Sequence, residues 1–269
     1  MPLSLLRTSD IAKTLGIHVN TVRNYEKWGY LPDVPRGENG YRAFTAVHLE
    51  HARLACMVLQ WPYLGERTPL VTLVQSAARY DFGAALEMAY DYLAQIRMAQ
   101  VKAETAVQFL EHWANGHLVE TTSQHMSIGQ AAEHLDVTVD MLRNWERNGL
   151  IAIPRQPSNQ YRQFGPTELA RVRVIRKLSQ SGYSLMAISG ALQQIDKGNS
   201  KNLRAALVLP PQASANAAID IPADHWQPSL QKMEKHAEAI IQQINCLIQL
   251  IYPQETAVLT SNQPSNITP

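Results

Sequence analysis

The sequence of 269 residues has little cysteine and contains no apolar run long enough to cross a membrane. Its two cysteines, Cys56 and Cys246, cannot form a disulfide framework or a cysteine zinc site, and their apolar neighbours predict buried thiols. The first residues lack the basic-then-apolar pattern of a signal peptide. We therefore expect a cytoplasmic protein with reduced thiols and no membrane partner.

Strong charge of either sign is also missing, because the net charge is only +1. Composition alone thus gives no sign of a nucleic-acid partner. The distribution is more informative: residues 1–60 hold seven Lys and Arg against five Asp and Glu, and residues 126–180 hold eight against five. Positive charge therefore gathers in two separate blocks, which indicates two surfaces suited to phosphate.

The short motifs of common enzyme classes are absent as well. The sequence has no glycine-rich phosphate loop, no Gly-x-Ser-x-Gly nucleophile elbow and no zincin motif. The histidine pairs His48/His51 and His112/His117 are typical of ordinary helix surfaces. We expect neither an enzyme nor a bound metal or cofactor.

What the sequence does contain is one unit that occurs twice. Residues 15–31 and 135–151 align without a gap at an offset of 120. The identical pairs are Leu15/Leu135, Val19/Val139, Arg23/Arg143, Asn24/Asn144, Glu26/Glu146 and Gly29/Gly149. The run Tyr-Arg-x-Phe follows at the same offset, at 41–44 and 161–164, so the repeat extends beyond the aligned stretch.

Each copy predicts a short helix, a tight turn, a second helix and a hairpin. Ser127 followed by Gln130 predicts a capped start for the first helix of the second copy. The second helices are expected over about 19–28 and 139–148, and each ends at a glycine. The next segment is rich in Pro, Gly and Asn, which is typical of a small two-stranded wing. The predicted fold class is mainly α, with two winged helix-turn-helix modules.

This unit resembles the DNA-binding module of MerR-family regulators. The resemblance rests on Ala12, Leu15, Gly16, Val22, Arg23, Tyr25, Glu26, Gly29, Asn39-Gly40-Tyr41-Arg42 and Phe44, with their second-copy equivalents. It implies a bacterial transcriptional regulator that binds double-stranded DNA and distorts a promoter for RNA polymerase. Both copies depart from the family pattern, since asparagine follows the helix arginine where an aromatic residue is usual.

The candidate DNA-binding residues follow from the geometry of such modules, whose recognition helix faces base edges while flanking groups hold phosphates. In the first copy they are Asn20, Thr21, Arg23, Asn24, Tyr25, Lys27, Arg36, Tyr41 and Arg42. In the second copy they are Asp140, Arg143, Asn144, Trp145, Arg147, Arg155, Tyr161 and Arg162.

Simpler roles exist for several of these residues. Arg23 and Arg143 each have a glutamate three residues later, which suits a helix-surface ion pair. Tyr25 and Trp145 fit a core position equally well. Asp140 suits a phosphate-lined groove poorly unless it accepts from a cytosine amine, so the second copy is expected to read a different, weaker half-site.

Two long helices are predicted after the modules, over 84–114 and 229–252. Both show apolar residues at every seventh position, which favours coiled-coil pairing over packing within one domain. By resemblance the pairing would be antiparallel. The short link before the second module favours an intramolecular pseudo-dimer, with a homodimer of four modules as the alternative.

These predictions divide the chain into six segments. They are a first module (1–75), a helical segment with a long helix and linker (76–125), a second module (126–198), a loop-rich insert (199–228), a long C-terminal helix (229–252) and a disordered tail (253–269). A small-molecule effector is an open possibility. Two other functions stay open: sequestering of a small molecule among the aromatic residues between Trp61 and Tyr92, and an architectural or recombination-accessory role on DNA.

Overall fold

The computed structural model describes residues 5–117, 124–199, 203–207 and 226–253. Within these ranges the fold is mainly α, as predicted. The described residues form two compact units. Unit 1 comprises those up to Ile96 together with those from Lys232 onward, and unit 2 runs from Arg97 to Gln231.

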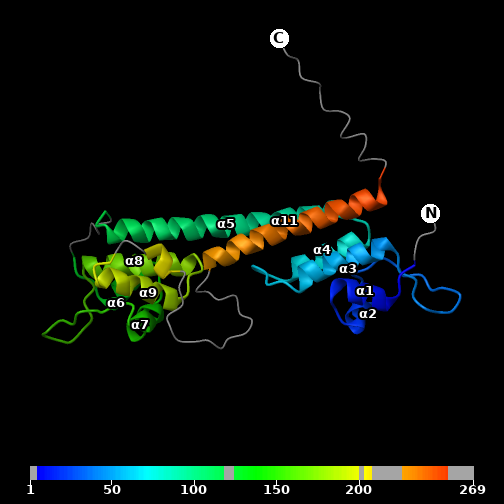
Figure 1. Ribbon diagram of the computed structural model, residues 1–269. Helices are drawn as coiled ribbons and strands as arrows, with labels where there is room; N and C mark the ends of the chain where they lie inside the picture. The colour runs from blue at the N-terminus through cyan, green and yellow to red at the C-terminus, as the bar shows by residue number, and fades with distance from the viewer. Residues whose placement is uncertain (1–4, 118–123, 200–202, 208–225, 254–269) are drawn as a thin grey trace, which may run out of the picture. The chain divides into compact units, whose positions relative to one another are not determined.

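The helices follow the order of the repeat. Unit 1 contains α1 (Thr8–Leu15), α2 (Val19–Lys27), α3 (Ala46–Leu59) and α4 (Thr68–Ala78). Unit 2 contains α6 (Ile128–His134), α7 (Val139–Arg147), α8 (Pro166–Gln180), α9 (Leu185–Asp196) and α10 (Leu203–Ala206). The long helices α5 (Phe82–Ala114) and α11 (Trp226–Ile251) contribute residues to both units. Figure 1 labels these helices except α10 and shows α1 and α2 beside α3.

The first helix-turn-helix is fixed by its turn and its caps. Gly16 takes the left-handed conformation (φ +65°), which lets the chain reverse between α1 and α2. The Nδ1 atom of His18 accepts a hydrogen bond from the amide of Asn20 at 3.1 Å and so caps α2. Beneath the helices, Ile11, Val22 and Phe44 are fully buried and form the core of the module.

The second helix-turn-helix repeats this construction with different residues. Asp136 occupies the left-handed position (φ +49°) that Gly16 holds in the first copy. Ser127 and Gln130 form the predicted capping box of α6, and Thr138 caps α7 through the amide of Met141 at 3.1 Å. The structure therefore confirms the repeat, because each local signal recurs at the same place.

The wings are smaller than the two-stranded sheets that the sequence predicts. Each is a hairpin with one isolated antiparallel bridge, Arg36 with Arg42 and Arg155 with Arg162. A second bridge joins the residue before the first helix to the end of the wing, Leu6 with Phe44 and Met126 with Phe164. Pro35 and Pro154, which precede the bridged arginines, have no N–H with which to extend the ladder.

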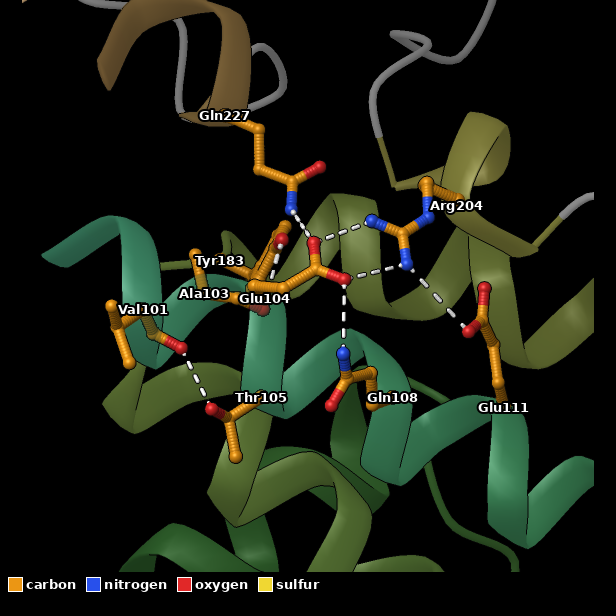
Figure 2. Close-up of polar contacts among 9 residues, drawn as sticks. All are labelled: Val101, Ala103, Glu104, Thr105, Gln108, Glu111, Tyr183, Arg204 and Gln227. Atoms are coloured by element: carbon orange, nitrogen blue, oxygen red, sulfur yellow. Dashed lines mark hydrogen bonds and ion pairs between the residues drawn. The ribbon is translucent and has the colours of Figure 1, made fainter. Parts of the chain in front are cut away.

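The long helices bury most of the apolar residues of their seven-residue repeat, and Leu86, Ala114 and Ile251 near the helix ends are half-buried. In unit 1, Phe82 at the start of α5 lies with its ring 6.5 Å from that of Tyr252, just after α11. In unit 2, Glu104 of α5 accepts hydrogen bonds from Arg204 of α10 at 2.5 and 2.9 Å and from Gln227 of α11 at 3.3 Å (Figure 2). The bonds from Arg204 lower the pKa of Glu104. Both contacts thus hold other segments against α5.

The two cysteines differ in their exposure. Cys56 is half-buried, but Cys246 is exposed, so the prediction of two buried thiols is wrong for Cys246. Cys246 lies on α11 outside its buried apolar stripe, which explains the exposure. Most of the predicted loop-rich insert and nearly all of the predicted tail lie outside the described residues. Among the described helices, none is both long and apolar enough to cross a membrane.

The sequence favoured a helix-surface position for His48 and His51, but both are buried in unit 1, so that expectation is wrong. His51 is 1% exposed, its ring stacks on Phe82 at 6.2 Å, and within the described residues neither of its ring nitrogens has a partner. Burial, with a contribution from His48, lowers its pKa to about 4. The native state therefore disfavours the charged imidazole.

This predicts a stability loss in mild acid. The unfolded chain binds a proton at His51 below about pH 6.5, whereas the native chain does so only near pH 4. The native state therefore has its full stability above pH 6.5 and loses stability as the pH falls below that value. We expect the free energy of unfolding to fall by about 1 kcal/mol from this site between pH 7 and 5.5. Urea titrations of His51→Leu should lose that part of the pH dependence, whereas the exposed control His112→Leu should keep it. Equal slopes for both variants would contradict the assignment.

Candidate nucleic-acid interface

The recognition helix of the first module, α2, has one buried and one exposed face. Val22 and Tyr25 point into the core, while Arg23 and Lys27 are exposed, as is Asn20 in the first turn. Thr21 and Asn24 are half-buried at the edges. Asn20, Arg23 and Lys27 therefore share the solvent side of α2, as a helix lying in a groove requires, and Thr21 and Asn24 border it.

Helix α7 repeats this pattern in the second module. Leu142 and Trp145 are buried, Asp140, Arg143 and Arg147 are exposed, and Asn144 is half-buried. The same positions thus face solvent in both modules, although the residues at the start of the two helices differ.

The aromatic residue of each recognition helix is the main departure from the predicted site. Tyr25 and Trp145 are each 3% exposed, so both belong to the core, which was the alternative assignment. The Tyr25 hydroxyl lies 3.7 Å from the Cys56 sulfur and accepts a hydrogen bond from Gln60 at 3.4 Å. Burial raises the pKa of this hydroxyl well above its ordinary value. Both side chains are thus buried in the core of their modules.

The helix arginines pair within their own helices. Arg23 donates to the side-chain oxygen of Asn20 at 3.2 Å, and Arg143 donates to Asp140 at 3.3 Å. Each arginine is therefore held by the residue three positions earlier, and not by the glutamate three positions later that the sequence suggested. The two pairs differ by one charge, since asparagine is neutral and aspartate is not.

The glutamates of the recognition helices instead fasten the wings. Glu26 binds Arg42 and lies 3.7 Å from the guanidinium of Arg36. In the second module Glu146 binds Arg162 at 2.8 Å and lies 4.0 Å from Arg155. Glutamate is thus the link between recognition helix and wing in both copies. We call this arrangement the wing clamp.

The wing tips carry an exposed tyrosine each. Tyr41 is 76% exposed and Tyr161 is 71% exposed. The preceding asparagines shape both tips, because Asn39 accepts from the amide of Tyr41 at 3.1 Å and Asn159 from that of Tyr161 at 3.0 Å. Aromatic side chains of this exposure can contact a sugar-phosphate backbone through ring and hydroxyl.

A basic groove runs between α2, the wing and the chain before α1 in the first module. It encloses about 960 Å³ and is lined by Arg7, Arg23, Arg36 and Arg42, with Glu38 as the acidic exception. Arg7 was missed by the sequence analysis, since it precedes the repeat and only the fold brings it to the wing. At the matching place the second module has Ser127, so it lacks this cation.

The same two regions match known families. Residues 126–195 match a family described as MerR HTH family regulatory protein, and residues 7–44 match one described as MerR family regulatory protein. The chain carries two MerR-type helix-turn-helix regions. The MerR-type match to residues 7–44 covers α1, α2 and the wing, which are the elements that line the basic groove.

Individual relatives agree with this MerR-type assignment. A mercuric resistance operon regulatory protein of Pseudomonas fluorescens is 30% identical over 78 residues, which are 29% of this chain and 54% of that protein. The HTH-type transcriptional regulator CueR of Escherichia coli O157:H7 is 34% identical over 77 residues, 28% of this chain and 57% of that protein. The chain thus spans about half the length of these relatives. No solved structure matches the chain.

The wing clamp yields a prediction for the MerR-type modules. Glu26→Gln should loosen the first wing, because the amide cannot attract Arg36 and Arg42 as a carboxylate does. The clamp is partly exposed, so we expect a stability loss of about 0.5–1 kcal/mol. Hydrogen exchange at the amides of Gly37 and Ala43, which bond across the hairpin, should become several-fold faster. Glu38→Gln on the same wing is the control, and equal exchange in both variants would contradict the clamp.

Proposed function

We propose that the chain is a sequence-specific, double-stranded DNA-binding regulator of transcription, with residues 1–75 and 126–198 as its two DNA-binding modules. The observation that carries this proposal is that each module combines an exposed arginine on the recognition helix, Arg23 or Arg143, with wing arginines bound by the glutamate of that helix. In the first module the helix arginine and the wing arginines line one groove. The matching families and relatives are regulators and not enzymes.

The distribution of charge supports two kinds of contact. Wing arginines at the groove edge suit phosphate oxygens, to which they can donate in pairs. The exposed first turn of α2 or α7 suits base edges in the major groove. Of the sequence-predicted residues, the proposal keeps all but Tyr25 and Trp145, whose burial gives them a packing role. In the first module Arg7 is added to these residues as a phosphate contact.

We further propose that the two modules act within one chain as a pseudo-dimer. In unit 1 the start of α5 meets the residue after α11, through Phe82 and Tyr252. In unit 2 a later residue of α5, Glu104, meets the beginning of α11 at Gln227. Each contact joins α5 and α11 of the same chain, which favours intramolecular pairing of these helices over pairing with a second copy.

The remaining partners follow from the family resemblance. Promoter distortion and a role with RNA polymerase are proposed on that basis, and a small-molecule effector stays possible. The sequestering alternative receives less support. Phe82 and Tyr92 are buried, and Trp61, although 42% exposed, stacks on His236 at 4.5 Å, so these three aromatics pack within unit 1.

Selection of bound duplexes from a random DNA pool tests the proposal. The full chain should enrich a site with two unlike half-sites. Arg23→Ala and Arg143→Ala should each weaken binding to one half-site by about tenfold or more, since each removes a base-directed guanidinium. Lys102→Ala on α5 removes the same charge elsewhere and should change neither. If no sequence is enriched at moderate salt, the DNA-reading function is refuted.

A further inference from the structure

The first turns of the two recognition helices differ at two positions that reach solvent, Asn20 against Asp140 and Thr21 against Met141. The first of these differences is one of hydrogen-bonding chemistry. Asn20 of α2 and Asp140 of α7 are equivalent in the repeat, and both hold the arginine of the next turn at nearly the same distance, 3.2 and 3.3 Å. The carboxylate of Asp140 is 88% exposed. At this position the two modules therefore hold the neighbouring arginine in the same way, but the first module offers an amide and the second a carboxylate.

That difference has a definite meaning on the edge of a base pair. Asparagine carries both a donor and an acceptor, so it can bond N7 and the amino group of adenine together. Ionised aspartate can only accept. In the major groove amino donors are offered by adenine and cytosine, but beside the adenine amine lies the acceptor N7, which repels a carboxylate. Cytosine offers its amine without that neighbour.

We propose that Asp140 is a specificity-determining residue, which makes the second module select cytosine where the first module, through Asn20, selects adenine. Arg143 and Arg23 occupy the equivalent position one turn on, where both would read guanine. The proposal rests on the DNA-binding function proposed above. It explains how one chain with a repeated fold reads two different half-sites.

A purely structural role for Asp140 makes a different prediction. An acidic residue in the first turn of a helix stabilises it through the helix dipole, and a pair at i,i+3 adds a little more. Asp140→Asn would then lower the melting temperature or change the general affinity for DNA, and it would leave the preferred base unchanged. Base preference therefore separates the two roles.

The experiment compares duplex selection by the full-length wild type, Asp140→Asn and Asn20→Asp, with thermal melts to establish folding. Asp140→Asn should change the preferred base in the second half-site from cytosine to adenine, with a shift of about tenfold or more in the ratio of the two bases. The first half-site should stay as it is. Asn20→Asp should produce the reverse change in the first half-site. Glu133→Gln, which removes an exposed acid from α6, is the charge-matched control and should alter neither.

The outcomes distinguish this proposal from the function on which it rests. If Asp140→Asn binds every duplex more tightly without a change of base, Asp140 acts only by repelling phosphate; this proposal is then overturned, and the DNA-binding function stands. The same holds if the wild type selects the same base at both positions. If the wild type enriches no sequence, both proposals fail together.

Discussion

The carboxylate between recognition helix and wing is the interaction on which each module depends. Helices of eight and nine residues are too short to be stable alone, and a hairpin with a single bridge is no better. Glu26 joins the two by binding a wing arginine, and Glu146 repeats this in the second copy. Without that link the wing would be held only at its end, by the bridge between Leu6 and Phe44 and the buried Phe44 ring, so its basic residues would be placed less firmly relative to the recognition helix.

Below this surface the two modules solve the same packing problem with different chemistry. Arg171 of α8 donates to the carbonyl of Leu150 at 2.7 Å and binds Asp196 of α9 at 2.6 and 2.8 Å. The equivalent residue in the first module is His51, buried between aromatic rings with unpaired nitrogens. At this position a polar network therefore binds the chain just after α7 in unit 2, whereas an aromatic cluster surrounds His51 in unit 1, which makes unit 1 the more sensitive to mild acid.

Local signals made much of the fold predictable from the sequence. Neighbouring residues alone predict the capping box at Ser127 and the glycine ends of the recognition helices. The glycine ends occur in both copies of the repeat, which strengthens that prediction. Heptad spacing likewise predicted most of the buried residues of α5 and α11, although Leu86, Ala114 and Ile251 of the predicted series are only half-buried. These features depend on contacts between residues close in the chain, which a pattern can reveal.

The features that sequence analysis missed depend on contacts across the fold. Glu26 has an arginine three residues before it, yet it binds Arg42, sixteen residues away. Tyr25 looked equally suited to DNA and core until packing placed its hydroxyl against Cys56. Arg7 joined the site only through the bridge between Leu6 and Phe44. Such pairings follow from tertiary packing, so spacing in the sequence could not decide them.

The central claim is that one chain reads DNA with two modules, and hydroxyl-radical footprinting tests it most directly. On a duplex taken from the selected pool, the full chain should protect two separate tracts. When one half-site is scrambled, the tract at that half-site should lose protection, and the other tract should stay protected at the same protein concentration. A single protected tract that survives scrambling of either half-site would contradict the account.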